Sequence, residues 1–272
     1  MKAATPVPNL PTDRGNPANS VDEIRKRIQS GRLTWAGPLL LVSARTVLLL
    51  LFQALTAAVL GLRHAAFPWV AAGKWWTIYG TLVDLGCLAL MWRFLRREGI
   101  GFRELIGRFR LRDIVAGLGW FAVIFPILGI CLPLSARIFY GTWFPYFDRG
   151  AVVSPLPLWA SLYTLFLWWT LWSATEETTY QAYVLPRLEA LMKRPLAATL
   201  VVAFFWALQH AAVPLVLDWR YPIWRVVATF PGVLAFVLVY RRTLRLPPLI
   251  IAHWPGDIFV AILSVTPARF LH

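Results

Sequence analysis

The chain alternates long apolar runs with short segments that are rich in Lys and Arg. Runs of about eighteen or more mainly apolar residues are long enough to cross the hydrocarbon core of a bilayer as helices. We therefore predict an all-α, polytopic membrane bundle of about seven transmembrane helices. The predicted spans are 38–60, 75–92, 114–134, 158–186, 196–217, 224–240 and 247–265.

The positive charges follow these spans in an alternating way. With a cytoplasmic N-terminus, the inside segments are 1–37, 93–113, 187–195 and 241–246, and they hold nineteen Lys and Arg residues against six in the outside segments. Cytoplasmic loops of membrane proteins carry such an excess. The pattern predicts an N-terminus in the cytoplasm. Segment 93–113 could lie as an amphipathic helix on an anionic leaflet or form a solvated loop.

Composition supports the membrane interpretation and narrows the class of partner. The chain is 58% hydrophobic and 15% charged, whereas soluble domains are nearer half apolar and a quarter charged. A net charge of +14 would suit nucleic acid, but the basic residues lie between apolar runs rather than in one patch. We therefore expect contact with anionic lipid headgroups and no nucleic acid. Cys87 and Cys131 lie inside apolar runs and are expected to be inert packing residues.

Ionisable residues inside the predicted spans form the candidate site. A charged side chain at the centre of a bilayer costs about 2.5–3.5 kcal/mol on insertion scales, so such residues are functional candidates. The second half of the chain contains Glu176 and Glu177 in the fourth span, His210 in the fifth, and His253 and Asp257 in the seventh. In the first two spans, Arg45 and Asp84 could form a structural pair.

Helical spacing groups these residues. Glu177 and Gln181 are four residues apart, as are His253 and Asp257, so each pair shares one face of a helix. Pro255 and the following glycine are expected to weaken or kink the last span, which is tolerated at membrane depth where a helix lines a polar cavity. The estimated depths allow the three groups to meet in the cytoplasmic half of the membrane or near its midplane.

Such a set of side chains suits hydrolysis inside the membrane. A Glu beside a His can hold and deprotonate a water molecule, and a second His or a protonated acid can donate to a developing oxyanion. Glu176, His210, His253 and Asp257 could instead coordinate a divalent metal such as zinc that activates the water. From residue types alone, a purely structural polar network is an equally open alternative.

Three sequence motifs resemble signatures of the CPBP family, the CAAX proteases and bacteriocin-processing enzymes. "TEETTYQAYVLPRL" resembles the Glu-Glu-x-x-x-Arg signature, and "FFWALQH" resembles the second signature, with its aromatic residue and His. "FPGVLAFVLVYRRTLRLPPLIIAHWPGD" is similar to the last signature, which ends in His-x-x-x-Asn. The motifs occur in the family's order on separate predicted spans, between about residues 158 and 260.

The resemblance implies an intramembrane endopeptidase that cuts near the C-terminus of a membrane-associated protein or peptide. By position, Glu176 would be the general base, His210 would help it hold the water, and His253 with residue 257 would stabilise the oxyanion. Glu177 would be structural and would pair with residue 181. Family members have been described both as metalloproteases and as metal-independent glutamate proteases; we favour a site without a metal, so no cofactor is expected.

The chain departs from the family pattern at two positions. Gln181 stands where Arg is usual, so its interaction with Glu177 would be at most a hydrogen bond between a neutral and a charged group. Asp257 stands where Asn is usual, and an ionised Asp cannot donate to an oxyanion. Asp257 would therefore be protonated, ligate a metal, or hold His253 in one tautomer. The alternative to an active protease is a catalytically degenerate membrane scaffold or immunity protein, and a proton-coupled transporter ranks below both.

These observations divide the chain into four parts. We expect a cytoplasmic segment at 1–37, N-terminal transmembrane helices and loops at 38–157, the catalytic transmembrane core at 158–265 and a C-terminal tail at 266–272. The expected partners are membrane lipid and a membrane-associated protein or peptide substrate, and the expected location is a bacterial inner membrane.

Overall fold

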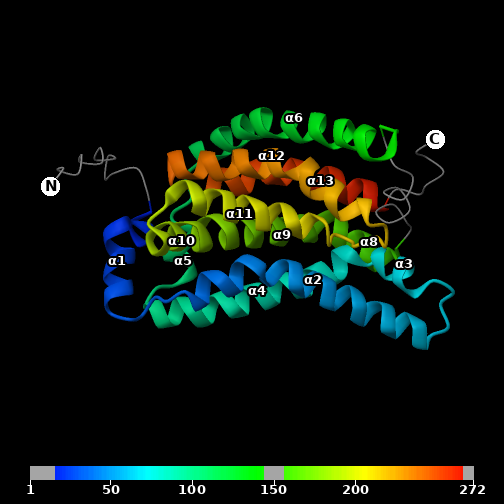
Figure 1. The fold of residues 1–272 in the computed structure, drawn as a ribbon, viewed down its shortest axis with the longest axis horizontal. Coiled ribbons are helices and arrows are strands. Elements are labelled where there is room, and N and C mark those ends of the chain that lie inside the picture. Colours follow the sequence, from blue (N-terminus) through cyan, green and yellow to red (C-terminus); the bar gives the residue numbers. More distant parts are fainter. Residues whose placement is uncertain (1–15, 144–155, 266–272) are drawn as a thin grey trace.

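The computed structural model describes residues 16–143 and 156–265, which contain helices, turns and loops but no strand (Figure 1). The N-terminal half contains η1 (Pro17–Asn19), α1 (Val21–Gln29), α2 (Ala36–Leu62), α3 (Pro68–Gly73), α4 (Trp76–Glu98), α5 (Phe102–Ile106) and α6 (Arg112–Tyr140). The C-terminal half contains α8 (Leu158–Tyr163), η2 (Thr164–Trp168), α9 (Trp169–Glu177), η3 (Thr178–Val184), α10 (Leu185–Met192), α11 (Pro195–His210), α12 (Arg220–Thr243) and α13 (Pro247–Val265).

Five of these helices, α2, α4, α6, α12 and α13, are long and apolar enough to cross a membrane. Apolar side chains also cover the outside of the bundle: α6 exposes Val115, Val123, Ile130 and Ile138 to more than half of their area. Monomeric soluble proteins rarely expose such a continuous apolar surface. The prediction of an all-α membrane bundle is therefore confirmed, while the count of seven spans remains a prediction.

The long helices lie side by side, with α6 along one side of the bundle and α2 with α4 along the opposite side (Figure 1). Helix α12 packs against α6 and α11, and α13 packs against α6 and α9. Helix α11 also contacts α2, which joins the two halves of the chain. Helix α1 lies across one end of the bundle, and α3 lies at the other end (Figure 1). The candidate residues on α9, α11 and α13 thus lie in the interior layer.

The predicted fourth span is one continuous helical run from 158 to 192 that contains two π-helical segments, η2 and η3. A π-helical turn bonds residue i to i+5 and therefore changes the direction of the side chains that follow. Segment η3 begins directly after Glu177. Such insertions occur frequently at functional sites, and this one lies beside the two carboxylates.

The predicted fifth span, 196–217, was wrong at its C-terminal end. Helix α11 has 16 residues and stops at His210, after which the apolar chain continues without a regular helix. The side chain of Gln53, which is 1% exposed, explains how this irregular backbone is stabilised. Its Nε2 donates to the carbonyl of Leu215 at 2.9 Å, and its Oε1 accepts from the amide of Leu215 at 2.8 Å. Irregular backbone beside the apolar part of a membrane requires such protein partners.

Segment 93–113 is not a single amphipathic helix. Residues 93–98 continue α4, Gly99 ends that helix with a left-handed backbone (φ 76°), and α5 covers only Phe102–Ile106. The predicted tail 266–272 and the outside residue Arg149 lie outside the described residues.

Helices α6 and α13 approach closely at a glycine. A Cβ atom on Gly117 would lie 2.7 Å from the carbonyl oxygen of Pro248 and 2.7 Å from Cβ of Ile251. By contrast, a Cβ atom on Gly119, two residues later, would meet nothing within 4 Å. The missing side chain at 117 therefore permits the contact that fixes α13 against α6.

Candidate active site

Glu176, at the end of α9, is held from one side by α11. Its side chain is 0% exposed, and its Oε1 accepts hydrogen bonds from Trp206 Nε1 and Gln209 Nε2. The ring of Tyr180 stacks on Trp206 at 5.4 Å between centroids. The other carboxylate oxygen, Oε2, is buried and has no hydrogen-bond partner among the described residues. One oxygen is thus fixed while the other is free to accept a proton.

His253 on α13 lies between three carboxylates. Its Nδ1 is 3.0 Å from Glu177 Oε1, and its Nε2 is 4.0 Å from Glu176 Oε2 and 3.7 Å from Asp257 Oδ1. The first distance is a hydrogen bond and the other two are longer contacts. Glu177 therefore orients the imidazole through Nδ1, which leaves Nε2 facing Glu176 and Asp257.

Aromatic rings surround His253, with Phe236 at 5.3 Å, Trp206 at 6.3 Å and Phe125 at 6.4 Å between ring centroids. The two Glu side chains are 0% exposed, whereas the side chains of His253 and Asp257 are 12% and 9% exposed. The site is thus enclosed by apolar walls and is most open on the side of α13.

His210 is the last residue of α11 and has no direct contact with Glu176 among the described interactions. Its Nδ1 lies 2.9 Å from the carbonyl oxygen of Trp206, which can only accept, so Nδ1 carries a hydrogen and donates it. The structure therefore brings Glu176, Glu177, His253 and Asp257 into contact and places His210 at their edge.

The predicted hydrogen bond between Glu177 and Gln181 is absent. Gln181 is 0% exposed, and neither its amide nitrogen nor its carbonyl oxygen has a partner among the described residues. The reason is the change to π-helical geometry between the two residues, because residues four apart no longer have α-helical positions. His253 takes the place of Gln181 as the partner of Glu177.

Arg45 connects the N-terminal half of the bundle to Glu176. Its Nη1 donates to Asp84 Oδ1 at 2.6 Å, and its Nε donates to Gln209 Oε1 at 2.8 Å. Its guanidinium also lies 4.3 Å above the ring of Trp172. Asp84, Arg45 and Gln209 thus form a hydrogen-bonded chain of side chains, and all three are 0% exposed. Since Gln209 donates to Glu176, this chain fixes the amide that orients the carboxylate.

The sequence motifs missed Gln209 as a contributor to the site. A neutral amide inside the apolar run "FFWALQH" was its only signal, and it stands directly before the recognised His210. The predicted pairing of Arg45 with Asp84 occurs, but its link to Glu176 depends on packing between helices that are distant in the sequence.

A metal ion would need converging ligands, and the described residues offer no group of three or more His, Cys, Asp or Glu side chains arranged to hold one. We therefore derive no step through a metal.

Comparison with known proteins identifies the region that contains the site. A family model described as Rce1-like, type II CAAX prenyl endopeptidase, matches residues 157–259, which include all six candidate residues. Searches of curated proteins and of solved structures gave no match. The description of this family is that of an endopeptidase, and the match covers less than half of the chain. Residues 157–259 are thus a Rce1-like region, in agreement with the resemblance to the CPBP family of intramembrane proteases.

Proposed function

We propose that this protein is an intramembrane endopeptidase that hydrolyses a peptide bond near the C-terminus of a membrane-associated protein or peptide. The observation that carries the proposal is the state of Glu176. Its Oε1 is held by Trp206 and Gln209, and its buried Oε2 has no hydrogen-bond partner among the described residues and lies 4.0 Å from His253 Nε2. A general base requires this combination of fixed position and free lone pair.

In the proposed reaction, Glu176 Oε2 accepts a proton from a water molecule whose position Nε2 of His210 helps to fix. The hydroxide attacks the carbonyl carbon of the scissile peptide, and Nε2–H of His253 donates to the oxygen that becomes negative. Glu176 then returns the proton to the leaving amine, so that one water is consumed and a carboxyl and an amine are formed. Glu177 accepts from Nδ1–H and orients the ring, so in this step His253 acts as the imidazolium, with a hydrogen on each nitrogen.

Asp257 has a different role here from that of an Asn donor. Its Oδ1 is 3.7 Å from His253 Nε2, too long for a hydrogen bond, and its Oδ2 has no partner among the described residues. We propose that a protonated Asp257 donates beside His253 to the oxyanion. A carboxylic acid can donate only in this form.

The proposal assigns the catalysis to the Glu176–His210 water and not to zinc. Zinc sites use three or four His, Cys, Asp or Glu ligands at about 2.0–2.3 Å. Elemental analysis of the purified protein tests this choice. Stoichiometric zinc that a chelator removes together with activity would contradict it.

The decisive experiment compares the C-terminal peptides of membrane proteins from cells that produce the wild type, Glu176→Gln, His210→Ala or the control Glu189→Gln. Glu189 pairs with Arg241 on α12, 2.7 Å away, outside the site. We expect C-termini that are present with the wild type and the control and absent with the two site variants. Cleavage that persists in both site variants would refute the proposal. If the wild type itself produces no new C-terminus, the degenerate scaffold or immunity protein becomes the better function.

We further propose a bacterial inner membrane as the location, with the N-terminus in the cytoplasm. Segment 93–111 lies near α1, whereas Leu215 accepts a hydrogen bond from Trp69 of α3 at the other end of the bundle (Figure 1). Labelling of single cysteines from each side of the membrane tests the topology. Equal accessibility of 93–113 and 214–223 from one side would overturn it.

A further inference from the structure

A cavity of about 970 Å³ opens at the end of the bundle that α1 covers. It lies between η1, α1, the end of α4, α5 and the turn that joins α12 to α13. Its lining contains six arginines: Arg27, Arg32, Arg103, Arg108, Arg110 and Arg245. Three glutamates, Glu23, Glu98 and Glu104, also line it.

The three glutamates of the cavity are already engaged. Glu23 pairs with Lys26 at 2.7 Å, and Oε2 of Glu104 accepts from the amide of Gly101 at 2.6 Å. Glu98 is bound by two guanidinium groups, as described below. Lys26 thus neutralises Glu23, whereas the amide of Gly101 leaves the charge of Glu104 in place. Of the six arginines, Arg245 pairs with Asp113, so the lining as a whole keeps an excess of positive charge.

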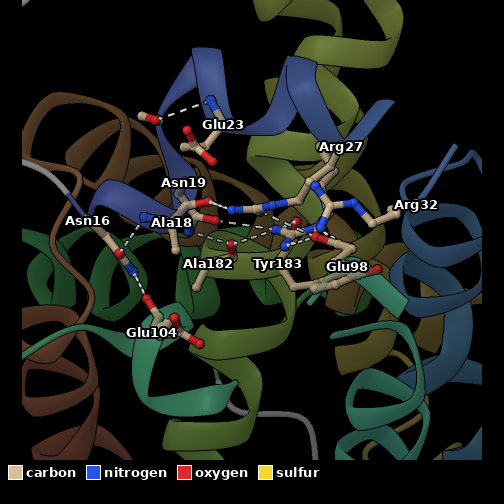
Figure 2. Close-up of polar contacts among 12 residues, drawn as sticks. Asn16, Ala18, Asn19, Glu23, Arg27, Arg32, Glu98, Glu104, Ala182 and Tyr183 are labelled. Atoms are coloured by element: carbon tan, nitrogen blue, oxygen red, sulfur yellow. Dashed lines mark hydrogen bonds and ion pairs between the residues drawn. The ribbon is translucent and has the colours of Figure 1, made fainter. Parts of the chain in front are cut away.

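Arg27 and Glu98, which line the cavity and lie close together in Figure 2, form one buried cluster with Arg187. Arg187 donates to Glu98 from Nε at 2.8 Å and from Nη2 at 2.6 Å, and Arg27 Nη1 lies 3.4 Å from the same carboxylate. Arg187, Glu98 and Arg27 are 0%, 2% and 4% exposed. Two guanidinium groups on one carboxylate leave one unit of positive charge without a counter-charge in this group. Burial, and then the neighbouring Arg187, lower the pKa of Arg27, which agrees with this excess.

The remaining hydrogen bond of Arg27 is to a neutral group, because its Nη2 donates to the carbonyl of Ala18 at 2.8 Å. Asn19, the last residue of η1, contributes only an amide, whose oxygen accepts from Arg187 Nη1 at 3.4 Å. A buried charge is costly unless it is paired and hydrogen-bonded. The uncompensated positive charge of this buried cluster would therefore favour the binding of an anion.

Arginines at the rim of the cavity also favour an anionic ligand. Arg103, Arg108 and Arg110 are exposed, and their side chains form no ion pair among the described residues. They lie on α5 and on the segment between α5 and α6, beside the ends of α4 and α12 and the start of α13. Helix ends of a membrane bundle lie at the level of the lipid headgroups.

We propose that this cavity is a binding site for a phosphate-bearing anion, either the phosphate of an anionic lipid headgroup or a soluble phosphate compound. The planar guanidinium group forms paired hydrogen bonds with phosphate oxygens, so a cluster of arginines selects this ligand chemistry. The site is separate from Glu176 and does not depend on the proposed protease activity.

The test measures the melting temperature of the full chain in an uncharged detergent while a probe is added. The probes are phosphatidylglycerol, phosphatidylcholine as the zwitterionic control, and pyrophosphate as the soluble phosphate. A ligand that binds only the folded state raises the melting temperature in a saturable way, which gives an apparent Kd. We expect phosphatidylglycerol or pyrophosphate, and not phosphatidylcholine, to do so.

Arg103→Gln combined with Arg108→Gln should weaken the apparent Kd by about thirtyfold, because each Arg near an anionic surface contributes about 1 kcal/mol. The matched control combines Arg93→Gln with Arg242→Gln, two exposed arginines outside the cavity lining. A response to the lipid alone identifies a headgroup site, and a response to pyrophosphate identifies a site for soluble phosphate compounds. No saturable response to either probe, or an equal loss in the control variant, would overturn the proposal.

Discussion

Arg45→Met provides a quantitative test of the buried chain Asp84–Arg45–Gln209. The substitution keeps a long unbranched side chain but removes two hydrogen bonds, from Arg45 Nη1 to Asp84 Oδ1 at 2.6 Å and from Arg45 Nε to Gln209 Oε1 at 2.8 Å. Both partners are 0% exposed, so water cannot replace the lost hydrogen bonds without a structural change. Gln209 keeps its hydrogen bond from the hydroxyl of Tyr180 at 3.2 Å, whereas Asp84 loses its ion pair.

The size of the effect follows from the unpaired Asp84. Removal of one partner of a buried ion pair typically costs about 3–5 kcal/mol, while replacement of both partners by apolar residues is often neutral or stabilising. For a chain of this size, about 2–4 °C of melting temperature corresponds to each kcal/mol. Arg45→Met should therefore lower the melting temperature by about 6–20 °C, and Arg45→Met with Asp84→Leu should recover most of that loss.

The assay is a double-mutant cycle of Arg45→Met, Asp84→Leu and the combined variant, with melting temperatures measured in one mild detergent. The expected interaction between the two sites is about 2 kcal/mol or more, because each single variant leaves a buried group unpaired. Strict additivity of the two substitutions would refute the argument, as would a change of less than about 3 °C in Arg45→Met. A lowered cleavage rate in the recovered double variant would further identify Arg45 as a positioning residue for Glu176.

Three other outcomes follow from the packing and the site. Gly117→Ala should lower the free energy of unfolding by about 1–3 kcal/mol, because the new Cβ atom would meet the backbone of α13. Gly119→Ala should be neutral or stabilising in the same melting assay. Equal effects of the two substitutions would contradict the close approach of α6 and α13 at Gly117. Gln181→Met should stabilise the protein by about 1 kcal/mol, because it removes a buried amide that has no hydrogen-bond partner among the described residues. Gln209→Met should destabilise the protein, because it removes the hydrogen bond to Glu176. A lower stability of Gln181→Met would show that the amide of Gln181 has a partner. Asp257→Asn should retain or improve cleavage if the residue donates to an oxyanion, and joint loss of cleavage and of bound zinc would instead identify a metal ligand.

The apolar runs and a few polar interruptions were enough to predict the helical class and the meeting of α9 with α13. Ionisable residues inside a span are so costly that their presence marks the bundle interior, and i, i+4 spacing placed His253 and Asp257 on one face. The same rule failed for Glu177 and Gln181, because nothing in the local sequence revealed the π-helical segment that begins between them.

The contacts that the sequence did not predict all join distant segments. Gln209 with Arg45 and Glu98 with Arg187 are separated by 164 and 89 residues, and a pattern with a period of a few residues contains no information about such pairs. The end of α11 was missed for a related reason. The residues after His210 are nearly as apolar as the helix itself, and their irregular backbone is stabilised by distant side chains, such as those of Gln53 and Trp69, which bond to Leu215.

The length of α11 also has a consequence for the lipid around it. Sixteen residues at 1.5 Å per residue form a helix of about 24 Å, whereas the hydrocarbon core of a typical bilayer is about 30 Å thick. Hydrophobic mismatch of this kind is relieved when neighbouring lipids compress, at a cost of a fraction of a kcal/mol for each Å. We therefore expect the bilayer to be thinner beside the helix that carries His210, and cleavage to be faster in phosphatidylcholine vesicles with shorter acyl chains. A rate that is independent of acyl-chain length would show that the rest of the bundle sets the local thickness.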